Sequence, residues 1–484
     1  MKNKYKASYL FLTLFVLECF PLFMNGQVTF QKHYPTTKDQ SGKDALPTTD
    51  GGYIIAATTE NNIVNDLDVL ITKTNNMGDT LWTKTYHGGD KPEYPNCILQ
   101  TNDGYLIVGY SQSFGGGDQD VYLLKISTSG DSLWTKVYGG FGNEDGKEIV
   151  ATADGNFVIV GASNSLNLSN NDVQLIKISP TGNVIWTKYY GGSTTYESAR
   201  SVKLCADGGF ILAGKKANIP NAVASIYMLK TNSAGDTLWT KTYSGGTDSY
   251  EGKFVLANND GTYTLCADDS SLSHDSDVRL MNISSSGDIL WNKSYGGSDK
   301  DICKMIQPTT DGGYIVAAIS RSFGWLNPDM WLLKINISGD TLWTRHFGGS
   351  GHEHCCAARQ TADGGYIAIG HTRSFGVIWQ ILFIKLNDLG NVVDVGPIAL
   401  NNTTFDIYPN PAKGLINIDL GDRPYSRATF RISNSLGQII LSEIIDPSSG
   451  IKNKEINLED KKRGIYFVTM QSSGNITTKK LILN

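Results

Sequence analysis

A tryptophan returns in the same local phrase every fifty-odd residues, and this spacing constrains the fold more than any other feature of the chain. Successive copies are 52 or 53 positions apart, and each stands in a segment that reads Gly-Asp/Asn-x-x-Trp-x-Lys/Arg-x-aromatic. An Asp-Gly phrase repeats with the same period. A regular period of this length indicates a protein built from one repeated structural unit. The tryptophans are Trp82, Trp134, Trp186, Trp239, Trp291 and Trp343.

One period alternates short runs of β-forming residues with turn residues. Between Gly191 and Tyr243 the pattern predicts strands at 199–205, 210–214, 226–230 and 238–243, separated by turns rich in Gly and Asp. Four short strands joined by hairpin turns are typical of one propeller blade. Because the central runs are apolar on both faces, neighbouring blades must cover them by stacking around an axis.

The number of blades follows from a mismatch between the two repeated phrases. Seven Asp-Gly phrases accompany only six Trp strands, and the last period lacks its Trp. The sequence 28–34 aligns with a Trp strand, and Phe30 stands 52 residues before Trp82. We expect this first mature strand to complete the last blade, which closes the ring and covers its open edges. The predicted fold is all-β: a seven-bladed β-propeller over 27–396 closed by the N-terminal strand, followed by a small C-terminal β-sandwich.

The first 26 residues have the layout of a cleavable signal peptide. A basic start at Lys2 to Lys6 precedes an apolar run over 7–23, and the chain then becomes polar. We expect cleavage before Gln27 and no membrane-spanning segment after it. The net charge of the chain is −5, and the ends are basic, so the middle carries about −10. This balance disfavours nucleic acid and anionic membranes as partners.

The last eighty residues leave the repeat. They contain Phe-Asp-Ile-Tyr-Pro-Asn-Pro from Phe405, then a Leu-Gly-Gln turn, a Gly-Ile-Tyr-Phe-Val strand and a Lys-Lys-Leu-Ile-Leu-Asn end. In this order they resemble the C-terminal sorting domain (Por type A) of type IX secretion substrates in Bacteroidetes. The resemblance implies that 405–484 interacts with the type IX machinery, and that 397–404 is the linker where processing occurs. The repeat itself resembles the bacterial β-propeller repeat of exported surface proteins, so we expect a secreted or cell-surface protein.

An acidic residue stands at the start of the first strand of each blade. A second acid precedes the third strand in most blades, and both sets fall on one face in a propeller. They form either an acidic funnel for a cation or basic ligand, or a scaffold in which each carboxylate accepts backbone N–H groups of a turn. Recurrence in every blade favours the scaffold. The ring consists of Asp39, Glu93, Glu144, Glu197, Glu251, Asp301 and Glu353.

Functional residues are better sought where the repeat fails. The segment Gly-His-Glu-His-Cys-Cys at 351–356 is the clearest departure, and His352, His354 and Cys356 are metal-ligand types that share one face of a strand. A zinc or other transition-metal site is one hypothesis for them; a scaffold role is the alternative. A second departure is Trp325 in a polar loop, which either stacks on a sugar ring or packs on its neighbour.

No nucleophile elbow, phosphate loop or metalloprotease motif is present in the sequence. We therefore predict no cofactor and no catalytic residues. The hypothesis is a monomeric binding or adhesion module that takes a glycan or a protein ligand. The competing hypothesis is a carbohydrate-active or metal-dependent enzyme that uses one loop face of the propeller. The six cysteines that remain after signal removal show no metal-type spacing, and their pairing stays open.

Overall fold

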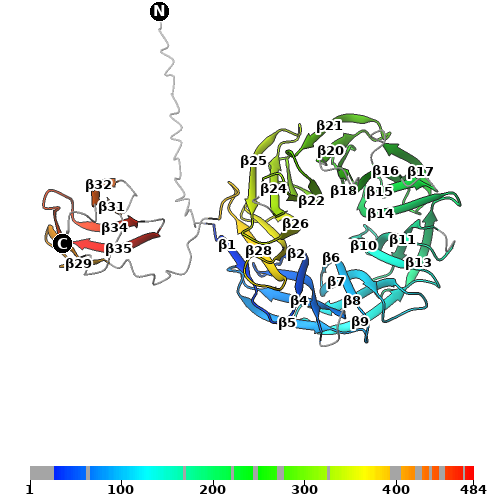
Figure 1. Cartoon of the computed structure of the whole chain (residues 1–484), viewed down its shortest axis with the longest axis horizontal. Helices are drawn as coiled ribbons and strands as arrows, with labels where there is room; N and C mark the ends of the chain where they lie inside the picture. The colour runs from blue at the N-terminus through cyan, green and yellow to red at the C-terminus, as the bar shows by residue number, and fades with distance from the viewer. Residues whose placement is uncertain are drawn as a thin grey trace, which may run out of the picture. The chain divides into compact units, whose positions relative to one another are not determined.

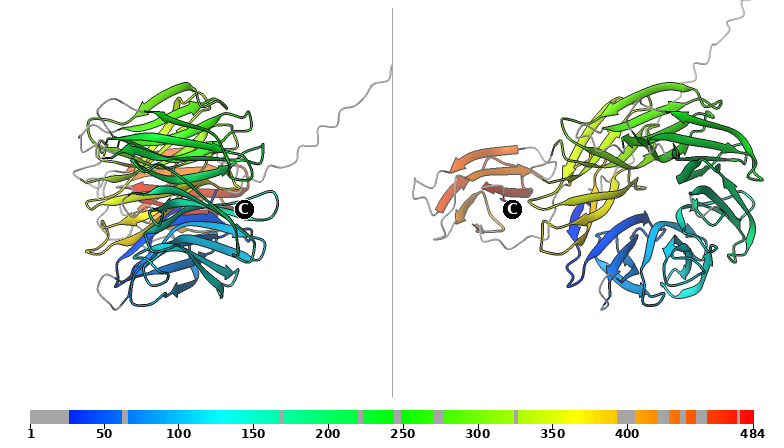
Figure 2. Two further views of the ribbon diagram at one scale, coloured as in Figure 1. Left: turned by 90° about the vertical axis from the view of Figure 1, so that its right-hand side faces the viewer. Right: turned by 45° about the vertical axis from the view of Figure 1, so that its right-hand side comes forward.

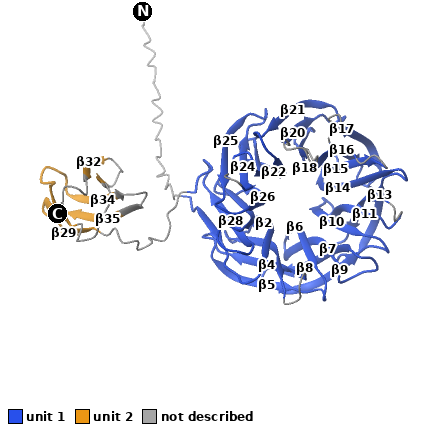
Figure 3. Ribbon diagram, in the orientation of Figure 1, with its two compact units in different colours: residues 1–393 blue, residues 394–484 orange. Residues whose placement is uncertain are grey.

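The computed structural model describes residues 27–484 except 62–65, 167–169, 220–222, 244–248, 270–276, 324–326, 393–404, 420–427, 435–438, 446–452 and 473–474. The predicted signal peptide (1–26) and linker (397–404) lie outside the described residues. Contacts divide the chain into two compact units, which meet in the sequence between residues 393 and 394 (Figure 3). Each unit is described by itself below.

The first unit is a ring of seven four-stranded antiparallel sheets (Figure 1). Blades 1 to 4 are β2(Gln40–Pro47), β3(Tyr53–Glu60), β4(Leu67–Thr74), β5(Thr80–Tyr86); β6(Glu93–Thr101), β7(Gly104–Ser111), β8(Asp120–Ser127), β9(Ser132–Tyr138); β10(Glu144–Ala151), β11(Phe157–Ser163), β12(Asp172–Ile178), β13(Val184–Tyr190); β14(Thr195–Leu204), β15(Phe210–Asn218), β16(Ala224–Thr231), β17(Thr237–Tyr243). Blades 5 to 7 are β18(Tyr250–Ala257), β19(Tyr263–Asp269), β20(Val278–Ile283), β21(Ile289–Tyr295); β22(Asp301–Pro308), β23(Tyr314–Ser320), β24(Asp329–Ile335), β25(Thr341–Phe347); β26(Glu353–Gln360), β27(Tyr366–Thr372), β28(Gln380–Leu386) with β1(Phe30–His33).

The N-terminal strand closes the ring as the sequence predicted. β1 pairs antiparallel with β28, with Phe30 opposite Lys385, so blade 7 has the order β1-β28-β27-β26. In the other blades the strands follow the chain from the innermost to the outermost. The edge-on view of the ring shows the blades stacked side by side around the axis (Figure 2).

The hydrophobic core of the ring lies between blades rather than within them. Middle strands such as β23 and β24 are buried along their whole length, whereas the outer strand β25 has exposed positions. Seven clusters of buried side chains each join two consecutive blades, one cluster to each junction. A blade therefore cannot bury its apolar faces without its neighbours, which explains why the chain repeats the unit until the ring closes.

The Trp phrase makes the contacts between blades. Trp82 on the outer strand β5 packs into the cluster between blades 1 and 2. Two positions further along, Lys84 Nζ lies 2.7 Å from the Asp131 carboxylate in the next blade. Tyr86 then donates its hydroxyl to the Gly130 carbonyl oxygen at 2.5 Å. The three residues of the phrase, spaced two positions apart, thus all contact the following blade.

A lysine of the third strand holds the Asp-Gly turn in six blades, and in five of them this lysine is buried. Lys73 on β4 is 4 % exposed, and its ammonium group lies 2.7 Å from Asp50 at the β2–β3 turn. Because an unpaired buried charge is costly, each such lysine needs its aspartate. The other pairs are Lys125–Asp103, Lys177–Asp154, Lys230–Asp207, Lys334–Asp311 and Lys385–Asp363.

The six cysteines of the described ranges form one disulfide and leave four free thiols. Cys266 on β19 and Cys303 on β22 form a disulfide that joins blades 5 and 6. The adjacent Cys355 and Cys356 are both free thiols, as are Cys97 and Cys205. The sequence left this pairing open, because residues far apart in the chain become neighbours only through blade stacking.

The second unit is the predicted small β-sandwich. One sheet has the order β29(Asp406–Tyr408), β30(Leu415–Asp419), β33(Asn453–Asn457); the other has β32(Ile439–Ile445), β31(Ala428–Asn434), β34(Gly464–Ser472), β35(Asn475–Leu483). Ile416 and Ile418 of the first sheet pack with Phe430 and Val468 of the second in one buried cluster. Two sheets that share a core of this kind form a stable sandwich. In the described part of the chain, no helix has the length and apolar character needed to span a membrane.

Candidate functional site

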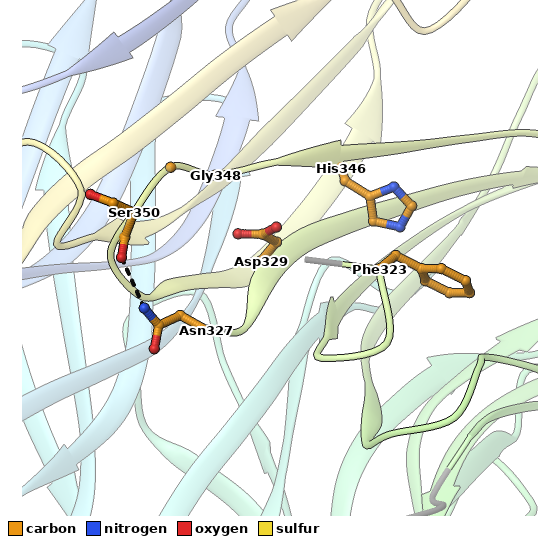
Figure 4. A pocket seen from close by; sticks show the side chains of 7 residues that line it. Phe323, Asn327, Asp329, His346, Gly348 and Ser350 are labelled. Carbon is orange, nitrogen blue, oxygen red and sulfur yellow. Dashed lines mark hydrogen bonds between the residues drawn. The ribbon is translucent and has the colours of Figure 1, made fainter. Parts of the chain in front are cut away.

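Residues that flank the two departures from the repeat in the sequence line one cavity. The cavity has a volume of about 580 Å³ and lies between blades 6 and 7 (Figure 4). Phe323 and Asn327 come from the β23–β24 loop, which also carries Trp325, and Gly348 to Ser350 form the connection that leads to His352. Asp329 and His346 complete the lining. We call this cavity the blade 6–7 pocket.

An aromatic group forms one wall of the blade 6–7 pocket. The rings of Trp331 and His346 stack with centroids 5.8 Å apart and planes 10° from parallel, because the two residues are directly opposite in the β24–β25 pair. Phe323 contacts both rings, with centroid distances of 5.3 Å to Trp331 and 5.1 Å to His346. Phe323 remains 47 % exposed, so its ring is available to a ligand. Burial lowers the pKa of His346, which keeps its ring neutral at physiological pH.

One acidic side chain, Asp329, lines the pocket, and a second, Glu353, lies buried next to it. Asp329, the first residue of β24, shares a hydrogen bond with Glu353, the first residue of β26. Burial, followed by the charge of Glu353 and this hydrogen bond, raises the pKa of Asp329 to about 6. Both carboxyl groups converge on Gly348, where an added Cβ would lie 1.9 Å from Asp329 Oδ1 and 2.6 Å from Glu353 Oε2. Only glycine fits between them.

The far side of the pocket is polar. Asn327 donates its side-chain amide to the Ser350 carbonyl oxygen at 2.9 Å, which ties the β23–β24 loop to the β25–β26 connection (Figure 4). The pocket therefore combines an aromatic face with an amide, a carboxyl group and a neutral imidazole. Pockets with an apolar wall and a few placed polar groups suit small organic ligands, sugars among them.

Blade 2 shows which part of this arrangement is special to blade 6. It has the same Ser-Phe-Gly loop, and Phe114 stacks on Tyr122 with centroids 6.5 Å apart. The residue opposite Tyr122 is Val137, whereas the residue opposite Trp331 is His346. The loop aromatic is thus part of the repeat, and the Trp–His pair is the local departure.

The acidic ring makes contacts within the scaffold. Glu93 Oε2 accepts the backbone N–H of Gly88 at 2.8 Å, and its Oε1 accepts the Ser111 hydroxyl at 2.8 Å. Glu144, Asp301 and Glu353 accept the equivalent glycine N–H groups at 2.8, 3.0 and 3.1 Å. These bonds hold the glycine connection between consecutive blades, so we treat these ring members as scaffold.

The remaining ring members differ in their partners. Asp39 Oδ1 accepts the Trp379 N–H at 2.6 Å. Glu197 lies 2.8 Å from Lys216 Nζ, and Glu251 lies 2.6 Å from Arg200 Nε. All ring members other than Asp39 are buried, so the ring does not present the open funnel of free carboxylates that a basic ligand would require.

The structure does not gather His352, His354 and Cys356 into a metal site. His354 on β26 is opposite His371 on β27, and their Nδ1 and Nε2 atoms are 3.2 Å apart. His352 precedes the strand and is exposed, and Cys356 is the extra residue of a β-bulge, which turns its side chain toward the propeller axis. No three His, Cys, Asp or Glu side chains in the described ranges form a metal-binding group. The shared strand face assumed from the sequence is lost at this bulge.

The other sequence-predicted site residue, Trp325, lies outside the described residues. Phe323 and Asn327, which flank it in the sequence, both line the blade 6–7 pocket. Sequence reasoning therefore found the loop but missed Phe323, Asn327 and His346. The signal for His346 was available, because it replaces the Thr, Val, Tyr or Ser that stands three residues after Trp in the other blades.

A second cavity lies on the opposite face, where blade 5 breaks the repeat. Asn282 replaces the buried lysine of the other blades and donates to the Thr264 hydroxyl at 3.4 Å. Asp260, at the β18–β19 turn, then has no lysine partner and accepts the Thr262 hydroxyl instead, at 2.7 Å. These residues line a cavity of about 800 Å³ between blades 5 and 6.

Comparison with protein families bears on the second unit. Residues 406–484 match the family described as "Secretion system C-terminal sorting domain". The C-terminal sandwich is a sorting domain of secreted proteins. It indicates export through the type IX system, to the cell surface or the medium, as the sequence resemblance implied. The sorting domain carries no information about what the propeller binds.

Comparison with solved structures gives remote matches to the propeller. A polysaccharide lyase, an ulvan lyase, is 8 % identical and has a TM-score of 0.48, over 74 % of this chain and 96 % of that chain. The propeller domain of the trilobed protease from Pyrococcus furiosus is 10 % identical, with a TM-score of 0.41 over 76 % and 100 %. At these TM-scores the matches carry no argument about function. A search of curated proteins finds no match to the chain.

Proposed function

We propose that the propeller is a secreted or cell-surface binding module that takes a polyhydroxylated ligand, a sugar residue of a glycan, in the blade 6–7 pocket. The observation that carries this proposal is the exposed Phe323 ring beside a Trp331–His346 stack, in a pocket that the Asn327 amide and the Asp329 carboxyl group also line. Aromatic faces pack on the C–H surface of sugars, and amide and carboxyl groups bind the hydroxyls.

The test is a glycan-binding array on the full chain, followed by titration of any glycan that binds. Phe323→Ala should weaken binding at least about tenfold. The matched control is Phe114→Ala, which removes the equivalent loop aromatic of blade 2 and should leave binding unchanged. Equal affinity of both variants and the wild type would rule out the pocket as the site.

A second candidate function is glycoside cleavage in the same pocket. It is favoured by the raised pKa of Asp329, which lets the carboxyl group hold a proton at mildly acidic pH, next to the second carboxyl group of Glu353. Asp329 would serve as the general acid; the second carboxyl group of a glycosidase stands about 5 Å or more from the acid, so Glu353, which is hydrogen-bonded to Asp329, does not fill that second role. Turnover of a glycoside substrate that is abolished by Asp329→Asn would favour the enzyme; binding without turnover would favour the binding module.

A further inference from the structure

Each inner strand of the propeller contains one β-bulge at the same position. The register of the first two strands of every blade skips one residue, as between Gly42 and Asp44 in blade 1 and between Cys303 and Met305 in blade 6. A bulge turns the extra side chain away from the regular alternation. The seven extra residues are Lys43, Asn96, Lys147, Arg200, Lys253, Lys304 and Cys356.

All seven bulge residues line one cavity on the propeller axis. The inner strands surround this axis in the view down the ring (Figure 1). The cavity has a volume of about 210 Å³. Five of its seven bulge residues are cationic, in a propeller whose formal charge is strongly negative. A narrow channel lined by one sign of charge concentrates counter-ions of the opposite sign.

The two acidic residues of the cavity wall form ion pairs with basic residues that do not line the cavity. Arg359 forms an ion pair and two hydrogen bonds with Asp44. Glu148 Oε2 accepts the Ser201 hydroxyl at 2.8 Å, and its other oxygen pairs with Lys203. These carboxylates therefore do not compensate the bulge cations on the axis.

Three of the bulge cations have carboxylate partners and two do not. Lys147 lies 2.7 Å from Asp145, Arg200 pairs with Glu251, and Lys253 shares Glu251 and Asp268. Lys43 and Lys304 have no ion pair and no hydrogen bond with any residue that the structure describes.

Lys43 and Lys304 stand on the two blades that flank Cys356. Burial, followed by the charges of Lys253 and Arg200, lowers the pKa of Lys304. An anion bound between the two lysines would raise this pKa again. In a scaffold without a ligand, two unpaired ammonium groups in a narrow channel would only repel one another. The free hydrogen-bond donors and the surplus positive charge at this place are what an oxyanion requires.

We propose that the axial cavity binds a small, multiply charged oxyanion, a phosphate or sulfate group, between Lys43 and Lys304. The group is either free or carried by a sugar, and a cavity of about 210 Å³ has room for one such group. This site is separate from the blade 6–7 pocket and shares no lining residue with it.

The test is calorimetric titration of the full chain at low ionic strength with inorganic phosphate, inorganic sulfate and a hexose 6-sulfate. We expect at least one to bind, and replacement of both lysines (Lys43→Met with Lys304→Met) to weaken it at least about tenfold. Lys136→Met on β9 is the matched control, because Lys136 is a half-buried lysine of an outer strand. Tighter binding of inorganic ions than of the sugar sulfate identifies a free anion, and the reverse order identifies a sugar-borne group.

A thiol reaction gives an independent measurement. Cys356 lies in the same cavity as the two lysines, so a bound anion should slow its alkylation by a neutral maleimide, followed on the Cys356 peptide by mass spectrometry. Thermal melting of the double variant shows that it is folded; we expect no loss, since neither lysine has a partner to lose. Unaltered affinity in the folded double variant, or no binding of any of the three anions, would overturn the proposal.

Discussion

Tyr34 donates its hydroxyl to the carbonyl oxygen of Gly78 at 2.9 Å, across the junction between the last blade and the first. Tyr86 makes the same bond to Gly130 one blade further on. The N-terminal strand therefore repeats the Tyr–Gly contact that five of the other six outer strands make, although its Trp is replaced by Phe30. Phe30 itself packs on Phe383 with centroids 5.4 Å apart.

We predict that Phe30→Ala destabilises the propeller by about 3 kcal/mol, because it leaves a cavity where β1 packs on β28, the strand pair that closes the ring without a connecting turn. Chemical denaturation measures the change. Leu81→Ala is the control, since Leu81 is 59 % exposed on an outer strand and should cost less than about 0.5 kcal/mol. Equal effects of the two substitutions would contradict a closing role for β1.

The disulfide should contribute to stability through the connection of blades 5 and 6. Its two cysteines are 37 residues apart, and closing a loop of that length stabilises a fold by about 4 kcal/mol in the chain-entropy description. Cys266→Ala with Cys303→Ala should lower the melting temperature, and a reductant should do the same to the wild type only. Cys205→Ala, which removes a buried free thiol, controls for the lost side-chain volume. A wild type that a reductant does not affect would speak against the bond.

The Asp329 carboxyl group should make stability depend on pH between about 4 and 6. Its pKa is about 6 in the fold, against 3.8 for an ordinary aspartate, so the folded protein holds a proton that the unfolded chain has lost. The stabilisation is complete below about pH 4 and is lost as pH rises through 6. The free energy of unfolding of Asp329→Asn, taken relative to that of the wild type, should therefore be about 1 kcal/mol higher at pH 7.5 than at pH 4.

Asp268 also has a pKa raised to about 6 and titrates in the same window. The difference between the wild type and Asp329→Asn, followed by denaturation across the pH range, isolates Asp329. Parallel stability curves for the two proteins would show that Asp329 titrates normally.

Restoring the repeat in blade 5 should be tolerated. Thr264→Ile with Asn282→Lys recreates the pair of an aliphatic residue and a lysine that the other blades have at this position, and the new ammonium group should meet Asp260. We expect stability to stay within about 1 kcal/mol of the wild type or to rise. Asp311→Asn in blade 6, which removes the partner of the buried Lys334, should instead cost about 2 kcal/mol. Thermal denaturation of both variants checks the contrast, and a large loss from the first would mean that blade 5 needs its departure for folding.

The period of the Trp phrase determined the architecture before any contact was known. It specified seven blades, the replacement of Trp by Phe30 and the closing strand, because each blade must bury its apolar faces against the next and the phrase supplies those contacts. The C-terminal motifs likewise identified the sorting domain. The acids of the ring could be located from the sequence, but their partners could not.

Only the tertiary structure decided where the side chains point. The bulge in β26 separates Cys356 from His354, which pairs with His371, and the same bulge in blades 1 and 6 directs Lys43 and Lys304 to the axis. A bulge shifts by one residue the alternation of side chains between the two faces of a strand, and the pattern of apolar residues in the sequence did not reveal that shift. The blade 6–7 pocket also arises from blade packing, which places a loop of one blade beside the first residues of the next. The sequence therefore determined the scaffold, and the register and stacking of the strands decided the sites.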